Sequence, residues 1–177
     1  MSKNLKTVPD NVIEYQNKEY WEERYSKLES HETFDWFNKT YKELKPLFDI
    51  YLPDKNVSIL MLGCGNSTLS EDMYDVGYHH ITNVDFSETV IENMRFRCKD
   101  RTEMSWIVMD VRDLTFQDET FDAVIDKGDV WNPKPEIVEN VKKVVDEVVR
   151  VLKFDGKVLN HFSNLEIVLE HKNGKIR

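Results

Sequence analysis

Residues 58–67 read Ser-Ile-Leu-Met-Leu-Gly-Cys-Gly-Asn-Ser, an apolar run that ends in a Gly-x-Gly turn. Four consecutive apolar residues are typical of a parallel strand that is covered on both faces. Gly63 and Gly65 allow the backbone to bend sharply and to approach a ligand closely. Thr68 and Glu71 have capping-box spacing, and apolar residues at helical spacing follow them. The stretch therefore predicts a strand, a tight turn and a helix start whose free N–H groups favour a nucleotide.

The turn departs from two well-known phosphate-binding motifs. Position 68 is threonine, where the dinucleotide fingerprint Gly-x-Gly-x-x-Gly has its third glycine. No Gly-Lys-Ser/Thr follows the turn, so it is not a P-loop. The glycine pair alone also fits an ordinary strand-to-helix connection, and other residues have to decide between the two interpretations.

Composition limits the possible functions. The chain has 177 residues, enough for one domain with a substantial core. Its 33 acidic and 24 basic residues give a formal charge of -9, which disfavours direct nucleic-acid binding. Two cysteines are too few for a disulfide framework or a zinc site, and they fit a reducing, cytoplasmic compartment. We find no apolar segment typical of an export signal or of a membrane span.

The rest of the chain alternates between helical and strand patterns. Helices are expected over residues 11–28 and from Tyr41 to Phe48, ahead of the first strand. Further strands are expected, with helices between most of them, over residues 81–85, 106–109, 121–125, 157–162 and 165–169. This alternation predicts an α/β fold with a doubly wound, mostly parallel sheet and helices on both faces.

Polar residues follow several of these strands. Asp85 ends the second strand, 22 residues beyond Gly63, where α/β sheets place a carboxylate that binds ribose hydroxyls. Alternatively, Asp85 caps the next helix, although Ser87 could do so alone. Asp110 follows the third strand and either contacts an adenine amino group or starts a loop. Lys127 leaves the fourth strand and faces the same crevice.

Aromatic residues are concentrated near the N-terminus. Trp21, Tyr25 and Leu28 share one helix face, and residues 34–37 read Phe-Asp-Trp-Phe. Such residues form core, or they line a pocket.

Six stretches together resemble one family, the S-adenosylmethionine-dependent methyltransferases. They are residues 59–71, Val84-Asp85, Met109-Asp110-Val111, Asp126-Lys127-Gly128, Tyr20-Trp21-x-x-Arg24-Tyr25 and Phe34-Asp35-Trp36-Phe37. Within that family the chain is most similar to eukaryotic lysine methyltransferases of translation elongation factor 1-alpha, from about residue 15 to residue 162. The resemblance implies S-adenosyl-L-methionine as cofactor, with S-adenosyl-L-homocysteine as product, and a cytoplasmic enzyme that methylates a lysine amine on elongation factor 1-alpha.

The resemblance also implies a set of cofactor-binding residues. They are Trp21, Tyr25, Trp36, Gly63, Cys64, Gly65, Asn66, Asp85, Phe86, Asp110, Val111 and Lys127. In this set Asp85 binds the ribose, and Asp110 with Val111 holds the adenine. S-adenosylmethionine carries a sulfonium cation and an amino-acid tail, so aromatic faces and carboxylates suit it.

We expect a single methyltransferase domain over residues 1–177. Its parts are a flexible tail (1–10), N-terminal helices over the cofactor site (11–52), a Rossmann-like core (56–162) and a residual C-terminal strand (163–177). Relatives place a longer segment, with a sixth strand, between the fifth strand and the last one. Here Phe162-Ser163-Asn164 passes directly to Leu165, and the loop after Gly128 is also shortened. Both changes fall on the acceptor side.

The predicted reaction leaves several points open. It needs no covalent nucleophile and no metal, and no residue of the sequence stands out as a general base. No membrane partner is predicted, and the sequence does not fix the oligomeric state or the number of methyl groups added. Two alternatives stay open: a methyltransferase for a small molecule, and a non-catalytic protein that binds S-adenosylmethionine or a partner. A nicotinamide dehydrogenase is disfavoured by Thr68 and by the aromatic N-terminal helix.

Overall fold

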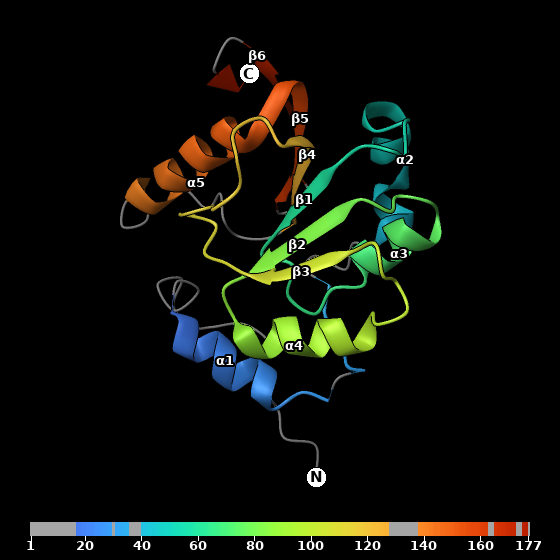
Figure 1. Cartoon of the computed structure of the whole chain (residues 1–177), viewed down its shortest axis with the longest axis vertical. Coiled ribbons are helices and arrows are strands. Elements are labelled where there is room, and N and C mark those ends of the chain that lie inside the picture. Colours follow the sequence, from blue (N-terminus) through green and yellow to red (C-terminus); the bar gives the residue numbers. More distant parts are fainter. Residues whose placement is uncertain are drawn as a thin grey trace.

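In the computed structural model, seven strands form one sheet in the order β3-β2-β1-β4-β5-β6-β7 (Figure 1). The structure describes residues 17–29, 31–35, 40–127, 138–162, 165–172 and 175–176. The strands are β1 (Ile59–Leu62), β2 (Ile81–Asp85), β3 (Ser105–Val108), β4 (Phe121–Asp126), β5 (Leu152–Phe162), β6 (Leu165–Lys172) and β7 (Lys175–Ile176). Strands β1 to β5 pair in parallel, whereas β6 and β7 are antiparallel to their neighbours. The predicted mostly parallel sheet is confirmed.

Helices cover both faces of the sheet. They are α1 (Lys18–Ser26), α2 (Tyr41–Tyr51), α3 (Leu69–Asp75), α4 (Glu88–Arg97) and α5 (Val138–Val151). Apolar residues of α1 to α4 join one buried cluster, and those of α5 join a second cluster on the opposite face. Figure 1 shows α1 beside α4 and α5 on the other side of the sheet. Among the described residues, no helix is long and apolar enough to cross a membrane.

Strand β1 lies at the centre of the sheet between β2 and β4. Its four residues are at most 3 % exposed. Ile59 and Met61 point into the cluster under α2, α3 and α4, whereas Leu60 and Leu62 point into the cluster under α5. The apolar run therefore supplies side chains to both cores, as a parallel strand covered on both faces must.

Two elements begin several residues away from their predicted starts. Helix α1 begins at Lys18 rather than near residue 11, because Asn17 has an extended backbone and its side chain accepts the N–H of Glu19 at 2.9 Å. Strand β5 begins at Leu152 rather than at Lys157. Residues 154–156 form an irregularity within β5, where Asp155 has a φ of 60° and the pairing with β4 shifts in register.

The C-terminal strands form an antiparallel hairpin. β6 pairs with β5 from Phe162 opposite Leu165 to Lys157 opposite Glu170. The predicted strand over residues 165–169 is confirmed and extends to Lys172. Residues 173 and 174, between β6 and β7, lie outside the described residues. Only residues 163–164 separate β5 from β6 in the chain.

Glu22 fastens α1 to the first turn of α4. Its carboxylate accepts hydrogen bonds from the Ser87 hydroxyl at 3.0 Å and from the backbone N–H groups of Glu88 at 2.7 Å and Thr89 at 3.2 Å. Burial acts to raise the pKa of Glu22, but these hydrogen bonds outweigh it and lower the pKa. A side chain of one helix therefore satisfies the N-terminal donors of another.

Replacing Glu22 should loosen this contact. We expect Glu22→Ala to lower the free energy of unfolding by about 1–2 kcal/mol, because α4 loses acceptors for its first turn. Chemical denaturation followed by tryptophan fluorescence measures the change. Glu23→Ala on the same helix is the control, because the Glu23 side chain is 69 % exposed and forms an ion pair with Lys27, the residue that caps the C-terminus of α1. Equal losses for the two variants would mean that the contact with α4 adds nothing.

Candidate functional site

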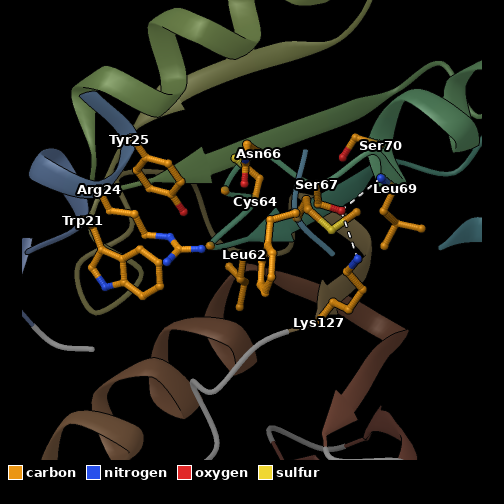
Figure 2. A pocket seen from close by; sticks show the side chains of 14 residues that line it. Trp21, Arg24, Tyr25, Leu62, Cys64, Asn66, Ser67, Leu69, Ser70 and Lys127 are labelled. Carbon is orange, nitrogen blue, oxygen red and sulfur yellow. Dashed lines mark hydrogen bonds between the residues drawn. The ribbon is translucent and has the colours of Figure 1, made fainter. Parts of the chain in front are cut away.

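A pocket lies where β1 and β4 end, between α1 and the start of α3 (Figure 2). The empty space within it, open mouth included, is about 460 Å³. The lining residues are Trp21, Arg24, Tyr25, Phe34, Met61, Leu62, Gly63, Cys64, Gly65, Asn66, Ser67, Leu69, Ser70 and Lys127. The pocket thus has one apolar and aromatic side, a glycine turn and two cationic side chains.

The glycine turn has a backbone that only glycine adopts without strain. Gly63 and Gly65 have φ angles of 52° and 50°, in the left-handed region. At Gly65 an added Cβ would lie 2.9 Å from the Tyr25 hydroxyl, whereas at Gly63 it would meet nothing within 4 Å. Gly65 is therefore required both for the turn and for the close approach of α1, and Gly63 for the turn alone.

Asp85 is buried behind this turn at the end of β2. One carboxylate oxygen accepts the N–H of Gly65 at 3.0 Å and the other accepts the N–H of Ser87 at 3.0 Å. Ser87 caps α4, since its hydroxyl accepts the N–H of Val90 at 3.3 Å. Burial, opposed by these hydrogen bonds, raises the pKa of Asp85 to about 6. Asp85 therefore links the glycine turn to the start of α4, with a carboxylate that titrates near neutral pH.

Arg24 brings a positive charge to the aromatic side of the pocket. Its guanidinium carbon lies 5.8 Å from the centroid of the Trp21 ring and 5.2 Å from that of Phe34. Trp21 and Tyr25 stack with their centroids 5.7 Å apart. Figure 2 shows the guanidinium directed from α1 towards Leu62. The residue is only 8 % exposed, so its charge acts within the pocket.

Lys127 supplies the second cation, from the end of β4. It forms an ion pair with Asp35 and donates a hydrogen bond to the Ser67 hydroxyl at 3.0 Å. The side chains of Lys127 and Asp35 are 6 % and 12 % exposed. Burial lowers the pKa of Lys127, although the charge of Asp35 opposes that effect.

The Asp35 pair belongs to a strap, residues 31–35, that crosses the glycine turn. The Asn66 side chain donates to the Glu32 carbonyl at 2.9 Å, and the Phe34 N–H donates to the Asn66 carbonyl at 3.4 Å. Asp35 itself accepts from the Ser67 hydroxyl at 2.5 Å. The strap thus joins the N-terminal segment to both β1 and β4 at the pocket.

The predicted capping box at the start of α3 is wrong. The Leu69 N–H donates to the Ser67 hydroxyl at 3.1 Å, and the Thr68 hydroxyl interacts with Asp35 and Asp72. Glu71 forms an ion pair with Arg97 of α4 instead of reaching back to Thr68. Partners far away in the sequence therefore replace the local cap.

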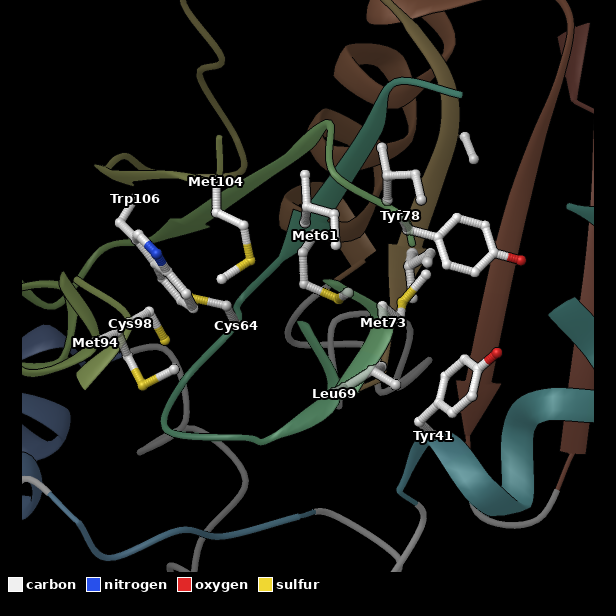
Figure 3. Close-up of a cluster of buried hydrophobic side chains, with 14 of the residues drawn as sticks. Tyr41, Met61, Cys64, Leu69, Met73, Tyr78, Met94, Cys98, Met104 and Trp106 are labelled. Carbon is white, nitrogen blue, oxygen red and sulfur yellow. The ribbon is translucent and has the colours of Figure 1, made fainter. Parts of the chain in front are cut away.

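Two buried thiols, Cys64 of the pocket lining and Cys98, belong to the same buried hydrophobic cluster (Figure 3). Burial raises the pKa of Cys64 well above its usual value and that of Cys98 to about 12, and the Cys98 thiol contacts the Glu71 carboxylate at 3.3 Å. Both are therefore uncharged at neutral pH. Across the described residues, no group of three or more His, Cys, Asp or Glu side chains could hold a metal ion.

Comparison with known proteins identifies the family. Residues 60–160 match the family model described as "Methyltransferase domain". The chain belongs to the methyltransferase-domain family. It is also similar, at 31 % identity over 199 residues, to EEF1A lysine methyltransferase 4 of Bos taurus, an alignment that covers 99 % of this chain and 74 % of the bovine protein. That alignment is longer than the 177-residue chain, so the relative contains residues that this chain lacks.

Two further relatives support this membership. The eEF1A lysine and N-terminal methyltransferase of Mus musculus is 38 % identical over 160 residues, which cover 88 % of this chain but only 22 % of the mouse protein. The chain thus spans about a fifth of the length of that relative. Among solved structures, the PH0226 protein from Pyrococcus horikoshii OT3 matches with a TM-score of 0.62 and 31 % identity, covering 77 % of this chain and 64 % of that chain.

The pocket of this methyltransferase domain contains seven of the twelve residues that the sequence suggested. They are Trp21, Tyr25, Gly63, Cys64, Gly65, Asn66 and Lys127. Asp85 is not in the lining but accepts a hydrogen bond from the lining residue Gly65. Phe86 packs against the buried cluster that contains Trp21. Asp110 and Val111 follow β3 and are not part of the lining, and Trp36 lies outside the described residues.

Asp110 has a partner of its own. It forms an ion pair with Arg112, whose hydrogen bonds lower the pKa of the Asp110 carboxyl. The lining residues that sequence reasoning missed include Arg24, Phe34 and Ser67. Arg24 and Phe34 belong to the two aromatic motifs, so the motifs themselves were the available signal.

Proposed function

We propose that this domain transfers a methyl group from S-adenosylmethionine to a lysine side chain of a protein, with elongation factor 1-alpha as the acceptor. The observation that carries the proposal is the hydrogen bond between Asp85 and Gly65. It places a buried carboxylate beside a left-handed glycine turn, in a pocket that also contains Arg24.

The residues present suit each part of the cofactor. Asp85 would accept hydrogen bonds from the ribose hydroxyls, and Arg24 would pair with the carboxylate of the amino-acid tail. The faces of Trp21 and Tyr25 suit a sulfonium cation. Asp110 and Val111, after β3, would contact the adenine, and Trp36 remains a predicted member of the site.

Catalysis in such a site depends on orientation. When bound, S-adenosylmethionine would supply an electrophilic methyl carbon, which the amine nitrogen would take from the sulfur, and the amine proton would go to solvent. The residues of the domain hold the two reactants in line, and orientation can supply roughly 7–11 kcal/mol of a barrier. The amine attacks in its neutral form, so a dry site that disfavours the ammonium assists the reaction.

Three features favour the proposed acceptor and compartment. The relatives from cow and mouse are both named as methyltransferases of eEF1A lysine. The formal charge of -9 favours a basic partner. An elongation factor as substrate implies a cytoplasmic enzyme, and we propose that residues 1–177 act as one domain, divided as the sequence indicates.

Cofactor titration tests the proposal. Isothermal titration calorimetry at pH 7.5 should show that Asp85→Ala binds S-adenosylhomocysteine at least tenfold more weakly than the wild type, because a charged hydrogen bond contributes roughly 1.5–3 kcal/mol. Asp100→Ala, at an exposed position after α4, should bind like the wild type. A radiolabelled methyl transfer assay on elongation factor 1-alpha then tests the acceptor.

The pH dependence gives an independent check. Because the pKa of Asp85 is about 6, the carboxylate becomes protonated below that pH, and cofactor affinity should fall as the pH drops from 7 to 5. Asp85→Ala should lose this dependence. The stability of the free protein should change with pH in the opposite direction. Because the pKa of Asp85 is higher in the folded than in the unfolded chain, the free energy of unfolding falls as the pH rises from about 4 to 6.

The outcomes separate the alternatives. A folded wild type that binds neither S-adenosylmethionine nor S-adenosylhomocysteine would rule out the enzyme and support an interaction protein. Cofactor binding without methylation of elongation factor 1-alpha would favour another acceptor, such as a small molecule.

A further inference from the structure

Two buried polar side chains meet where the end of β4 pairs with β5. Asp126, the last residue of β4, pairs in register with Asn160 of β5, and the Asn160 amide donates to the Asp126 carboxylate at 2.9 Å. Asp126 is 1 % exposed and Asn160 is 3 % exposed. The side-chain oxygen of Asn160 is buried and accepts no hydrogen bond from the residues that the structure describes.

An unpaired buried acceptor is unusual and calls for a donor. Buried side-chain oxygens nearly always have a partner, because their loss of hydration is otherwise uncompensated. The Asn160 oxygen and the Asp126 carboxylate are both acceptors, and the carboxylate adds negative charge. Together they match a group that carries N–H donors and a positive charge, which is the chemistry of a primary amine.

The position of this pair relative to the pocket supports the match. Leu62 of β1 is the register neighbour of Asp126, and Lys127 is the next residue along the chain. Both of these neighbours line the pocket. The pair lies on the β5 side of β1, whereas Asp85 lies on the β2 side, so the two carboxylates are on opposite flanks of the glycine turn.

We propose that Asp126 and Asn160 form an amine-binding pair, which receives the amino group of the acceptor. The Asn160 oxygen accepts an N–H of that group, and the Asp126 carboxylate attracts the ammonium form on arrival, before the amine loses its proton to solvent and attacks in its neutral form. This inference rests on the proposed function and adds the residues that select an amine as the acceptor.

A titration with a simple amine tests the pair without the protein substrate. The probe is n-butylammonium, which is a lysine side chain without its backbone. Nuclear magnetic resonance, with and without S-adenosylhomocysteine, should show that it shifts the side-chain amide signal of Asn160, identified by its loss in Asn160→Leu. Butyltrimethylammonium has the same charge but no N–H donor, and it should shift that signal less.

Kinetics on elongation factor 1-alpha give a second readout. Asn160→Leu should raise KM for the acceptor at least tenfold and keep cofactor affinity within twofold of the wild type. Asn160→Asp keeps the shape of the side chain and an acceptor oxygen, so it should bind n-butylammonium better than Asn160→Leu does.

Asn83→Leu is the structural control, because Asn83 is fully buried but hydrogen-bonded to Ser70 and Ser105. It should lower thermal stability and leave acceptor KM unchanged.

Three results would overturn the pair. They are an Asn160 signal that n-butylammonium leaves unmoved, equal shifts from the two ammonium ions, and an Asn160→Leu variant that loses cofactor binding as much as activity. Failure of the wild type to bind S-adenosylhomocysteine would instead contradict the proposed function. The amine titration of the free protein would still show whether Asp126 and Asn160 bind an amine.

Discussion

Asp35→Asn should lower the free energy of unfolding by about 3–5 kcal/mol, because it removes the negative partner of a buried ion pair. The Lys127 ammonium would lose the negative charge of Asp35, and the Ser67 hydroxyl would lose the carboxylate that accepts its hydrogen bond. The strap would then hold less firmly to the glycine turn. Urea denaturation monitored by tryptophan fluorescence measures the change.

Two variants make this measurement specific. Asp49→Asn removes an exposed partner of Lys45 on α2, with side chains 55 % and 54 % exposed, and should cost less than about 1 kcal/mol. The double variant Asp35→Asn with Lys127→Met removes both charges and should be less destabilised than Asp35→Asn alone. If Asp35→Asn matched the Asp49→Asn control, the ion pair would not stabilise the strap.

Gly65→Ala should be the second severe change, with an expected loss of about 2–5 kcal/mol. A left-handed alanine costs roughly 1–2 kcal/mol, and overpacking adds roughly 1–3 kcal/mol. The added methyl group would lie 2.9 Å from the Tyr25 hydroxyl, so α1 would have to move. Thermal unfolding should show the loss, and calorimetry should show weaker binding of S-adenosylhomocysteine.

The neighbouring glycine provides the matched control. Gly63→Ala pays the same backbone strain without a steric contact and should cost only about 1–2 kcal/mol. Adding Tyr25→Phe to Gly65→Ala removes the hydroxyl and should recover part of the loss. Equal effects for the two glycine variants, with no recovery, would show that the approach of Tyr25 does not matter.

The sequence predicted the features that depend on local patterns. The apolar run of β1, the glycine turn and the position of Asp85 follow from residue spacing, and the structure confirms β1 and the turn. The capping box failed because Thr68 and Glu71 have partners at Asp35 and Arg97, far away in the sequence. Local spacing cannot reveal such competition.

The site was predictable only in part, for the same reason. Arg24 lies within the Tyr-Trp-x-x-Arg-Tyr motif, but its place in the pocket depends on how α1 packs over the sheet. The contact between Asp126 and Asn160 depends on the pairing register of β4 and β5, which are separated by α5 in the chain. Residues that act through tertiary contacts need the fold before their roles can be assigned.

The two buried thiols have a consequence for how the domain reacts with its surroundings. An alkylating reagent needs a thiolate that it can reach, and neither Cys64 nor Cys98 provides one in the closed fold. Labelling therefore has to wait for a local opening, and its rate reports how often the pocket floor and α4 separate. A bound ligand that holds α1 against the glycine turn would slow the labelling of Cys64, so the domain contains its own reporter of pocket opening.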